Sequence, residues 1–475
     1  MFFGQMLGSV RVGLIVIIVL IFLVAASDFV PVLRRLSQVL SPILSGSRLE
    51  ICLASLTGMV LLIEGMAAMA PLTGSDALHY HFTAPLLILR SGFHPNFFLS
   101  HSFFCGQSHL LILMGLAIGS TQFAMGLIFL GGLLAAAACA CLMRRWANVP
   151  WAWTAALVFL LTPVVFWQIS AAGAPDLWMA FFATTGILVM SRAKELPRPA
   201  HALLTGVLAG GVAGAKYTGC LIAASMAAAY FWEARSIIRR LFFLSGSLCA
   251  GIWPYARNFV WTGDPMFPFL TQWFTPDKLN AYGLASYRAD TGAGAHTNLW
   301  MILKFVFFAG IDSQHPGFWQ FLGPIIIAFA PLLILAVRRD ATWRSALIVW
   351  MPSALGIGWS SGMTRFLPPI LPVALAAVLA GAAQLAAAGW RAARYVSLAS
   401  IGGFLFFGAA SMLYYDRPAL AAAAGFVSRE EYLLQRAPEY EKVRFINEVL
   451  AAKEAGGKTL VFVRHVFYLR VPFLY

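Results

Sequence analysis

The chain has 475 residues, of which 60% are hydrophobic and only 11% are charged, and its mean hydropathy is +0.79. Soluble globular domains are about half apolar and about a quarter charged, so this composition excludes an ordinary soluble protein. The apolar residues form runs of helix-spanning length rather than short alternating segments. We therefore expect an all-α polytopic membrane protein.

The formal net charge of +14 would suggest a nucleic-acid partner if the protein were soluble. Here, however, arginine and lysine gather in the short gaps between apolar runs, as they do in cytoplasmic loops. We therefore predict no nucleic-acid partner. Five of the six cysteines lie inside apolar runs, where they resemble small hydrophobic residues and predict neither disulfides nor a thiolate metal site.

Residues 13–33 form the first long apolar run. We interpret it as a membrane anchor rather than a cleaved signal peptide, because the cleavage pattern of small residues is missing. Counting the later spans places the N-terminus outside, unless this run is a hairpin broken near Asp28 and Pro31. The next span is expected at residues 51–70.

Residues 71–121 are expected to form the first outer loop. Residues 71–102 carry four of the nine histidines together with prolines, an acid and an arginine. This segment is too polar to cross the bilayer, whereas residues 106–118 are apolar but short and more typical of an interfacial or re-entrant helix. We therefore expect short helices lying on the membrane surface.

Basic residues alternate with the remaining apolar runs, so that about 12 spans are expected in all. After the first two, they are expected at residues 122–143, 150–167, 177–190, 202–215, 217–232, 241–255, 318–337, 346–359, 367–388 and 395–413. Residues 257–317 form a second outer loop with an interfacial helix at 298–310, and a loop of this length is usually functional or disordered. Glycines within and between the spans at 202–215 and 217–232 predict close helix packing.

The composition changes at Asp416. We expect residues 1–415 to form the membrane domain and residues 416–475 a small extracytoplasmic α/β segment. Residues 439–454 predict a helix with Val443, Ile446 and Leu450 on one face, and residues 459–463 predict a strand. A single strand leaves its edges unpaired, so either the tail docks on the membrane domain or it is part of a longer unit.

Ionisable residues outside the basic loops gather at one membrane surface. The span count places at the outer side Asp76, Asp176, Lys216, Arg257, Asp264 and Arg365. An isolated carboxylate at the mouth of a span is costly, which makes Asp76 the candidate reaction centre. Cations beside an acid suit a phosphate leaving group that faces an acceptor losing a proton.

Each of these residues also has a structural interpretation. Asp76 could cap an interfacial helix, and Asp176 could stabilise the N-terminus of the next span. Lys216 could extend to the lipid headgroups. Arg257 and Arg365 could bind headgroups instead of a substrate phosphate, because a guanidinium grips either one with two hydrogen bonds.

His79 and His81 follow the acid closely and could suggest a metal site. Residues two apart point to opposite faces of a helix, so the two rings are poorly placed to share an ion. We therefore interpret these histidines as interfacial or substrate-contacting residues.

Five segments, in this order, resemble the GT-C superfamily of integral-membrane glycosyltransferases, in particular the group of protein O-mannosyltransferases and lipid A aminoarabinose transferases. The segments are Gly74-Ser-Asp-Ala-Leu-His-Tyr-His, Ala174-Pro-Asp-Leu-Trp-Met-Ala-Phe-Phe, Gly210-Gly-Val-Ala-Gly-Ala-Lys-Tyr-Thr-Gly, Arg257-Asn-Phe-Val-Trp-Thr-Gly-Asp-Pro-Met-Phe-Pro and Thr364-Arg-Phe-Leu-Pro-Pro-Ile-Leu-Pro. With further positions in the tail, the resemblance extends from Pro71 to the C-terminus.

The resemblance implies transfer of a sugar from a polyprenyl-phosphate carrier to a glycan, lipid or protein acceptor, with inversion, at the outer face of a bacterial inner membrane. It implies Asp76 as the base and Lys216, Arg257 and Arg365 as ligands of the donor phosphate. The substrate-binding candidates are His79, Tyr80, His81, Asp176, Tyr217 and Asn258.

Many relatives carry an acidic pair at the position of Asp76, whereas Ser75 and Ala77 flank a single acid here. We therefore predict no obligate metal or other cofactor. A polymerase or ligase that uses pyrophosphate-linked glycans would show similar features and stays an alternative. A secondary transporter is disfavoured, because the sequence shows no internal repeat and its charges gather at one surface.

Overall fold

The computed structural model describes residues 13, 16, 19 and 20, together with residues 46–475 except 98, 193–197, 279–284, 286–297, 309–320, 334–339, 390, 452–458, 461–464, 471, 472 and 475. The described chain is almost wholly helical, which confirms the all-α prediction. The first predicted span, at residues 13–33, lies outside the described residues apart from single positions.

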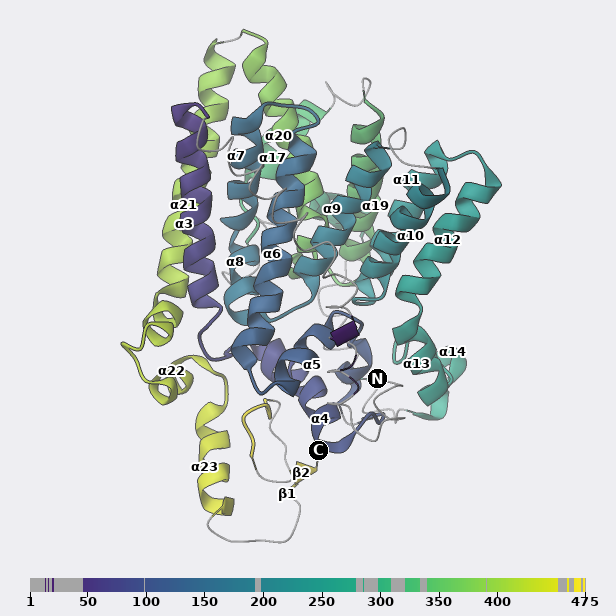
Figure 1. Cartoon of the computed structure of the whole chain (residues 1–475), viewed down its shortest axis with the longest axis vertical. Coiled ribbons are helices and arrows are strands. Elements are labelled where there is room, and N and C mark those ends of the chain that lie inside the picture. The colour runs from purple at the N-terminus through teal and green to yellow at the C-terminus, as the bar shows by residue number, and fades with distance from the viewer. Residues whose placement is uncertain are drawn as a thin grey trace.

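The first half of the described chain builds most of the bundle (Figure 1). Its elements are α3 (Arg48–Ala67), the π-helix η1 (Ala77–His81), α4 (Thr83–Ser91), η2 (Ser100–Phe104), α5 (His109–Ala117), α6 (Thr121–Met143), α7 (Val149–Leu160), α8 (Pro163–Trp167), the π-helix η3 (Gln168–Ala172), α9 (Asp176–Ser191), α10 (Arg198–Ala213), α11 (Thr218–Glu233) and α12 (Ile237–Gly251).

The second half completes the bundle and adds the tail. Its elements are α13 (Trp253–Thr262), α14 (Thr271–Phe274), η4 (Pro276–Lys278), α16 (Leu299–Phe308), α17 (Ile325–Phe329), η6 (Ala330–Leu332), α19 (Ala341–Ser360), η7 (Thr364–Phe366), η8 (Pro368–Ile370), α20 (Leu371–Ala387), α21 (Arg391–Ala423), α22 (Arg429–Arg436), α23 (Tyr440–Ala451), β1 (Thr459–Leu460) and β2 (Phe473–Leu474).

Helix α20 forms the centre of the bundle. Its residues from Leu371 to Ala383 are all buried. The helix packs against α6, α7, α9, α19 and α21. Small residues such as Ala376, Ala380 and Gly381 allow this many neighbours, because short side chains let helix backbones approach closely.

Four described helices are long and apolar enough to cross a membrane: α3, α6, the unit of η8 and α20, and α21. A fifth candidate is α7 with α8 and η3, bent by 59°. The predicted count of about 12 is therefore not confirmed by length and composition within the described residues. Several predicted spans are helices of 15 or 16 residues, shorter than the roughly 20 residues that a full crossing needs.

Two predicted segments differ in the structure. The span expected at residues 241–255 is interrupted, because α12 ends at Gly251 and α13 begins at Trp253. Arg257 consequently lies inside a helix rather than in an outer loop. The short apolar run at residues 106–118 forms α5, whose nine residues reach about 14 Å at 1.5 Å per residue and cannot span the bilayer.

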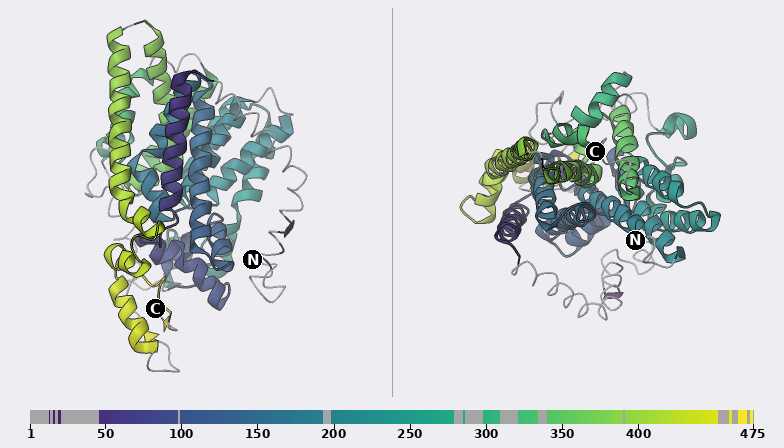
Figure 2. Two further views of the ribbon diagram at one scale, coloured as in Figure 1. Left: turned by 60° about the vertical axis from the view of Figure 1, so that its left-hand side comes forward. Right: turned by 90° about the horizontal axis from the view of Figure 1, so that it is seen from above.

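The tail leaves the bundle at the end that carries α4 and α5, and α22 and α23 project beyond it (Figures 1 and 2). Helix α21 continues to Ala423, so the predicted start of the tail at residue 416 falls inside a helix. Helix α23 confirms the predicted tail helix. The strands β1 and β2 pair in parallel over two residues each, so an α/β unit is not confirmed.

The predicted glycine packing is confirmed between α10 and α12. A Cβ atom at Gly206 would lie 2.0 Å from the Phe243 carbonyl oxygen, and one at Gly210 would lie 2.3 Å from that of Ser247. These backbones are in contact, and any side chain would push the two helices apart.

We expect Gly206→Leu to lower the midpoint of thermal unfolding in detergent. The leucine collides with backbone rather than with a movable side chain, and overpacking of this kind costs roughly 1–3 kcal/mol or more. Gly402→Leu in α21 is the matched control, because no atom in the described part of the chain lies within 4 Å of a Cβ atom there. Equal midpoints for the two variants would contradict the predicted contact.

Candidate active site

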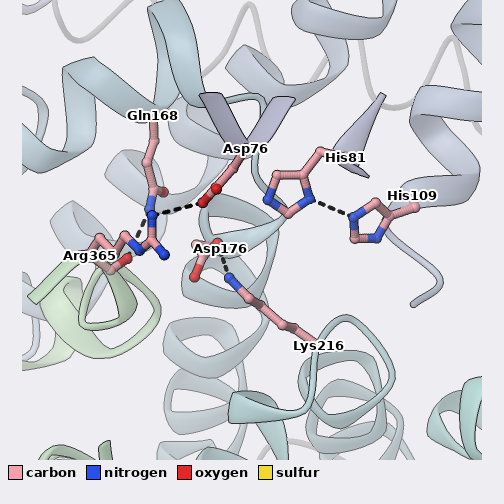
Figure 3. A network of polar contacts seen from close by, with 7 residues as sticks. All are labelled: Asp76, His81, His109, Gln168, Asp176, Lys216 and Arg365. Atoms are coloured by element: carbon pink, nitrogen blue, oxygen red, sulfur yellow. Dashed lines mark hydrogen bonds and ion pairs between the residues drawn. The ribbon is translucent and has the colours of Figure 1, made fainter. Parts of the chain in front are cut away.

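The predicted polar residues meet where the ends of several helices come together (Figure 3). Asp76 directly precedes η1, and Asp176 is the first residue of α9. Lys216 lies between α10 and α11, and Arg365 lies in η7. Four segments far apart in the sequence therefore supply two carboxylates and two cations to one end of the bundle.

Asp76 and Arg365 form the more exposed of two ion pairs. The Arg365 Nη1 atom donates to the Asp76 Oδ2 atom at 2.8 Å, across a separation of 289 residues. The side chains are 28% exposed for Arg365 and 16% for Asp76. The Gln168 Nε2 atom donates to the Arg365 carbonyl oxygen at 3.2 Å and holds the backbone of η7. The pair is thus fixed in place but open on one side.

Asp176 and Lys216 form the buried pair. The Lys216 Nζ atom lies 3.4 Å from the Asp176 Oδ2 atom, and the side chains are 9% and 1% exposed. Asp176 also sits at a helix N-terminus, where the helix dipole favours a negative charge. The other carboxylate oxygen, Oδ1, is buried and has no hydrogen-bond partner among the described residues.

The Phe366 ring links the two pairs. The Lys216 Nζ atom lies 4.3 Å from the centre of this ring, and the Arg365 Cζ atom lies 5.2 Å from it. Both cations therefore contact one aromatic ring, an arrangement that stabilises positive charge in a partly dry site.

His81 and His109 lie beside the ion pairs and hydrogen-bond each other, with 2.7 Å between the His81 Nδ1 and His109 Nε2 atoms. Burial lowers the pKa of His81 well below its usual value, and His109 and the Lys216 cation lower it further. Burial likewise lowers the pKa of His109 to about 3. Both rings are therefore neutral at neutral pH.

The neighbouring aromatic residues pack around a further histidine. His79 contacts the His101 ring, with 4.8 Å between centroids, and Tyr80 contacts the same ring at 5.3 Å. Burial raises the pKa of Tyr80 well above its usual value, which keeps its hydroxyl protonated. His79 and His81 thus contact different histidines, as expected for residues on different helix faces. Within the described part of the chain, no three His, Cys, Asp or Glu side chains are grouped to hold a metal ion.

The predicted residues Arg257, Asn258 and Tyr217 form a separate cluster. Arg257 donates from Nη1 to the Cys105 carbonyl at 2.7 Å, from Nη2 to the Phe103 carbonyl at 2.8 Å and from Nε to Asn258 at 2.9 Å. Asn258 donates in turn to the Tyr217 hydroxyl group.

This second cluster has a structural explanation. Tyr217 donates to the Phe267 carbonyl at 2.8 Å, and the Arg257 guanidinium lies 5.1 Å and 5.2 Å from the rings of Trp253 and Trp261. Three nitrogens of Arg257 already bind protein oxygens, so its geometry favours anchoring the segment from Phe103 to Cys105 over binding a phosphate.

The sequence did not single out Gln168, His109 or Phe366. Gln168 directly follows the span expected at residues 150–167, His109 lies in the short apolar run at residues 106–118, and Phe366 belongs to the Thr364 segment without having been assigned a role. An amide directly after an apolar span, as at Gln168, was the only local signal.

We expect Lys216→Met to destabilise the protein, because it leaves the Asp176 carboxylate buried without its cation. Breaking a buried pair costs about 3–5 kcal/mol. The double variant Lys216→Met/Asp176→Leu should recover much of this loss. The measurement is the thermal unfolding midpoint in detergent.

Arg344→Met is the matched control, since Arg344 pairs with Glu233 at 3.7 Å on the surface, where both side chains are nearly half exposed. Such pairs contribute about 0–1 kcal/mol. If Lys216→Met lowered the midpoint no more than Arg344→Met does, the buried pair would not be a structural requirement.

Comparison with known proteins supports the fold. Residues 49–243, less than half of the chain, match a family model described as the DUF1420 N-terminal domain. No curated protein sequence matches the chain. The apo structure of the Archaeoglobus fulgidus oligosaccharyltransferase is 13% identical to this chain, with a TM-score of 0.46. The match covers 88% of this chain and 61% of the oligosaccharyltransferase, and the structural similarity is weak.

Two crystal structures of ArnT from Cupriavidus metallidurans are more similar. The structure bound to undecaprenyl phosphate is 16% identical with a TM-score of 0.55, and the apo structure is 17% identical with a TM-score of 0.56. In each case the similarity covers 89% of this chain and 85% of ArnT. ArnT is a lipid A aminoarabinose transferase of the group that the sequence motifs indicated, and the chain has the GT-C fold of these membrane glycosyltransferases.

Proposed function

We propose that this protein moves a sugar from a polyprenyl-phosphate carrier to a glycan, lipid or protein acceptor. The observation that carries the proposal is the meeting of two acid–cation pairs around Phe366 at one end of an apolar bundle. The similar ArnT structure is bound to undecaprenyl phosphate, a ligand with an anionic group on an apolar chain. Such a donor suits a site with two cations next to the bilayer.

In the proposed mechanism, the donor phosphate binds Arg365 and Lys216. The acceptor hydroxyl oxygen attacks the anomeric carbon while the bond from this carbon to the phosphate oxygen breaks. The phosphate keeps the electron pair, and the two cations stabilise its charge. Asp76 takes the proton of the hydroxyl group. Attack opposite the leaving group inverts the anomeric centre.

The donor phosphate also explains how Asp76 is released for this role. In the structure its carboxylate is occupied by Arg365 at 2.8 Å. A phosphate that binds the guanidinium competes for it and leaves Asp76 oriented toward the acceptor. Under this mechanism Arg257 holds the segment from Phe103 to Cys105 and does not touch the donor.

We place the reaction on the extracytoplasmic side of a bacterial inner membrane. The ends of α6 and α9 that precede Arg144, Arg145 and Arg192 lie at the opposite end of the bundle from α4 and α5 (Figure 1). Loops rich in arginine stay in the cytoplasm. The site at the other end would then face outward.

The donor class is the first test of the function. We expect purified protein in lipid nanodiscs to consume polyprenyl-monophosphate sugars and to leave pyrophosphate-linked oligosaccharides intact. Release of the lipid carrier, followed by thin-layer chromatography, measures both reactions. Consumption of the pyrophosphate-linked donor alone would show a polymerase or ligase instead.

Asp76→Asn should lower kcat by roughly 10²–10⁴-fold, because the amide keeps the shape and the contact with Arg365 but cannot accept the proton. Transfer of radiolabelled sugar measures the loss. Asp277→Asn is the matched control, since Asp277 is exposed in η4. Retention of most activity in Asp76→Asn would reduce Asp76 to a structural residue.

Arg365→Ala should weaken donor binding, whereas Arg257→Lys should leave it unchanged in folded protein. A guanidinium bound to phosphate contributes about 1.5–3 kcal/mol, or roughly 10- to 150-fold in Kd. Titration with polyprenyl phosphate, followed by tryptophan fluorescence, gives both constants. If both variants weakened donor binding equally, Arg257 would also be a ligand of the donor phosphate.

A further inference from the structure

The C-terminal tail contacts the loop that carries Asp76. The His465 Nε2 atom lies 2.8 Å from the Ser75 Oγ atom, one residue before Asp76. The Tyr468 hydroxyl donates to the Leu72 carbonyl at 3.0 Å. These two contacts bind the tail to the loop on the N-terminal side of the candidate base.

Two more contacts lie on the C-terminal side of Asp76. The Phe467 ring packs edge-on against Phe82, with 5.9 Å between centroids. The Arg90 Nη1 atom donates to the Leu469 carbonyl at 3.3 Å. The tail therefore spans the loop from Leu72 to Arg90, with the base in between.

The other ring nitrogen of His465 also binds a side chain. Its Nδ1 atom lies 2.9 Å from the Glu439 Oε2 atom, and Lys442 contacts the other oxygen of this carboxylate at 3.4 Å. Glu439 adopts a positive φ of 59°, which non-glycine residues rarely do. In the tautomer whose Nδ1 atom donates to the Glu439 carboxylate, the Nε2 atom accepts a hydrogen bond from the Ser75 hydroxyl group.

The tail segment that contacts the loop is itself bound to helix α23. Asn447 on α23 donates to the Tyr468 carbonyl at 3.0 Å and accepts from the Arg470 amide at 2.8 Å. Val443, Val466 and Leu469 form a buried apolar cluster beneath it. The contacts with the loop are therefore mounted on a helix.

The opposite side of the loop is also fixed. A Cβ atom at Gly74 would lie 2.2 Å from the Ala171 carbonyl oxygen, so the loop backbone presses directly on η3. The loop thus lies between η3 and the tail, and Arg365 forms an ion pair with the Asp76 carboxylate.

We propose that the C-terminal tail is a working part of the transfer site, in which His465 is a positioning residue that holds Ser75 and thereby aims the Asp76 carboxylate. This inference rests on the proposed function of Asp76. It assigns to the tail a role in the chemical step, because its contacts with Ser75 and Leu72 lie directly beside Asp76.

The order serine, histidine and carboxylate is also that of a nucleophilic triad. In acyl transfer, however, a negative oxygen forms beside the serine and needs hydrogen-bond donors. Here the Asp76 carboxylate is the next residue. The geometry therefore favours positioning over a nucleophilic Ser75.

The test compares His465→Ala, Ser75→Ala and Glu439→Gln in the full chain. Each should lower kcat about 10- to 100-fold, since misplacing a catalytic group by about 1 Å can cost roughly 100-fold. The KM for the polyprenyl-phosphate sugar should change less than about two-fold. His465→Gln, whose amide can still reach Ser75, should restore part of kcat.

Arg444→Ala is the matched control, because Arg444 pairs with Glu430 at 3.1 Å and with Glu448 at 3.7 Å, both within the tail. Its kcat should equal that of the unchanged protein. An unchanged kcat in both His465→Ala and Ser75→Ala would overturn the proposal. Labelling of Ser75 by a fluorophosphonate probe would also overturn it, by showing a nucleophile.

A second measurement does not depend on transfer. Hydrogen exchange of the amides at residues 74–82 should quicken in His465→Ala and Ser75→Ala but not in Arg444→Ala. If the unchanged protein transferred no sugar, the proposed function would fail, while faster exchange would still show that the tail positions the loop. Unchanged exchange in both loop-contact variants would reject the positioning role itself.

Discussion

The structure depends on ion pairs between buried and partly buried side chains at one end of an apolar helix bundle. A single ammonium or carboxylate removed from water costs at least several kcal/mol, so neither Lys216 nor Asp176 could stay buried alone. Because Asp176 begins α9 and Lys216 joins α10 to α11, their contact at 3.4 Å fixes how these helices meet. Phe366 then covers the ammonium at 4.3 Å and places η7, from which Arg365 reaches Asp76.

The two ion pairs differ in exposure, and this difference separates their roles. The pair of Lys216 and Asp176 is almost dry, whereas Asp76 and Arg365 are 16% and 28% exposed. Partly solvated pairs are weaker than dry ones, so the contact between Asp76 and Arg365 is the easier of the two to exchange. Under the proposed mechanism Lys216 and Arg365 both bind the phosphate, but only Arg365 leaves its carboxylate partner to do so.

The sequence was sufficient to place both ion pairs at one end of the bundle, because topology follows from loop charges, which are local. It could not show that Arg257 binds the carbonyls of Phe103 and Cys105, since that depends on α13 beginning at Trp253. Hydropathy also hides helix ends such as Gly251, where the span expected at residues 241–255 is interrupted. The GT-C motifs supplied the fold, while the pairing of side chains required the packed structure.

The C-terminal tail is a second case in which the sequence predicted an element but not its contacts. An unpaired strand suggested docking, yet β1 pairs with β2, and the docking contacts come from the turn that holds His465 and Tyr468. Asp76 is consequently held from separate parts of the chain: Arg365 at its carboxylate, η3 behind Gly74 and the tail at Ser75. No single segment defines the position of Asp76, because its neighbour Ser75 contacts His465, which lies 390 residues away in the sequence.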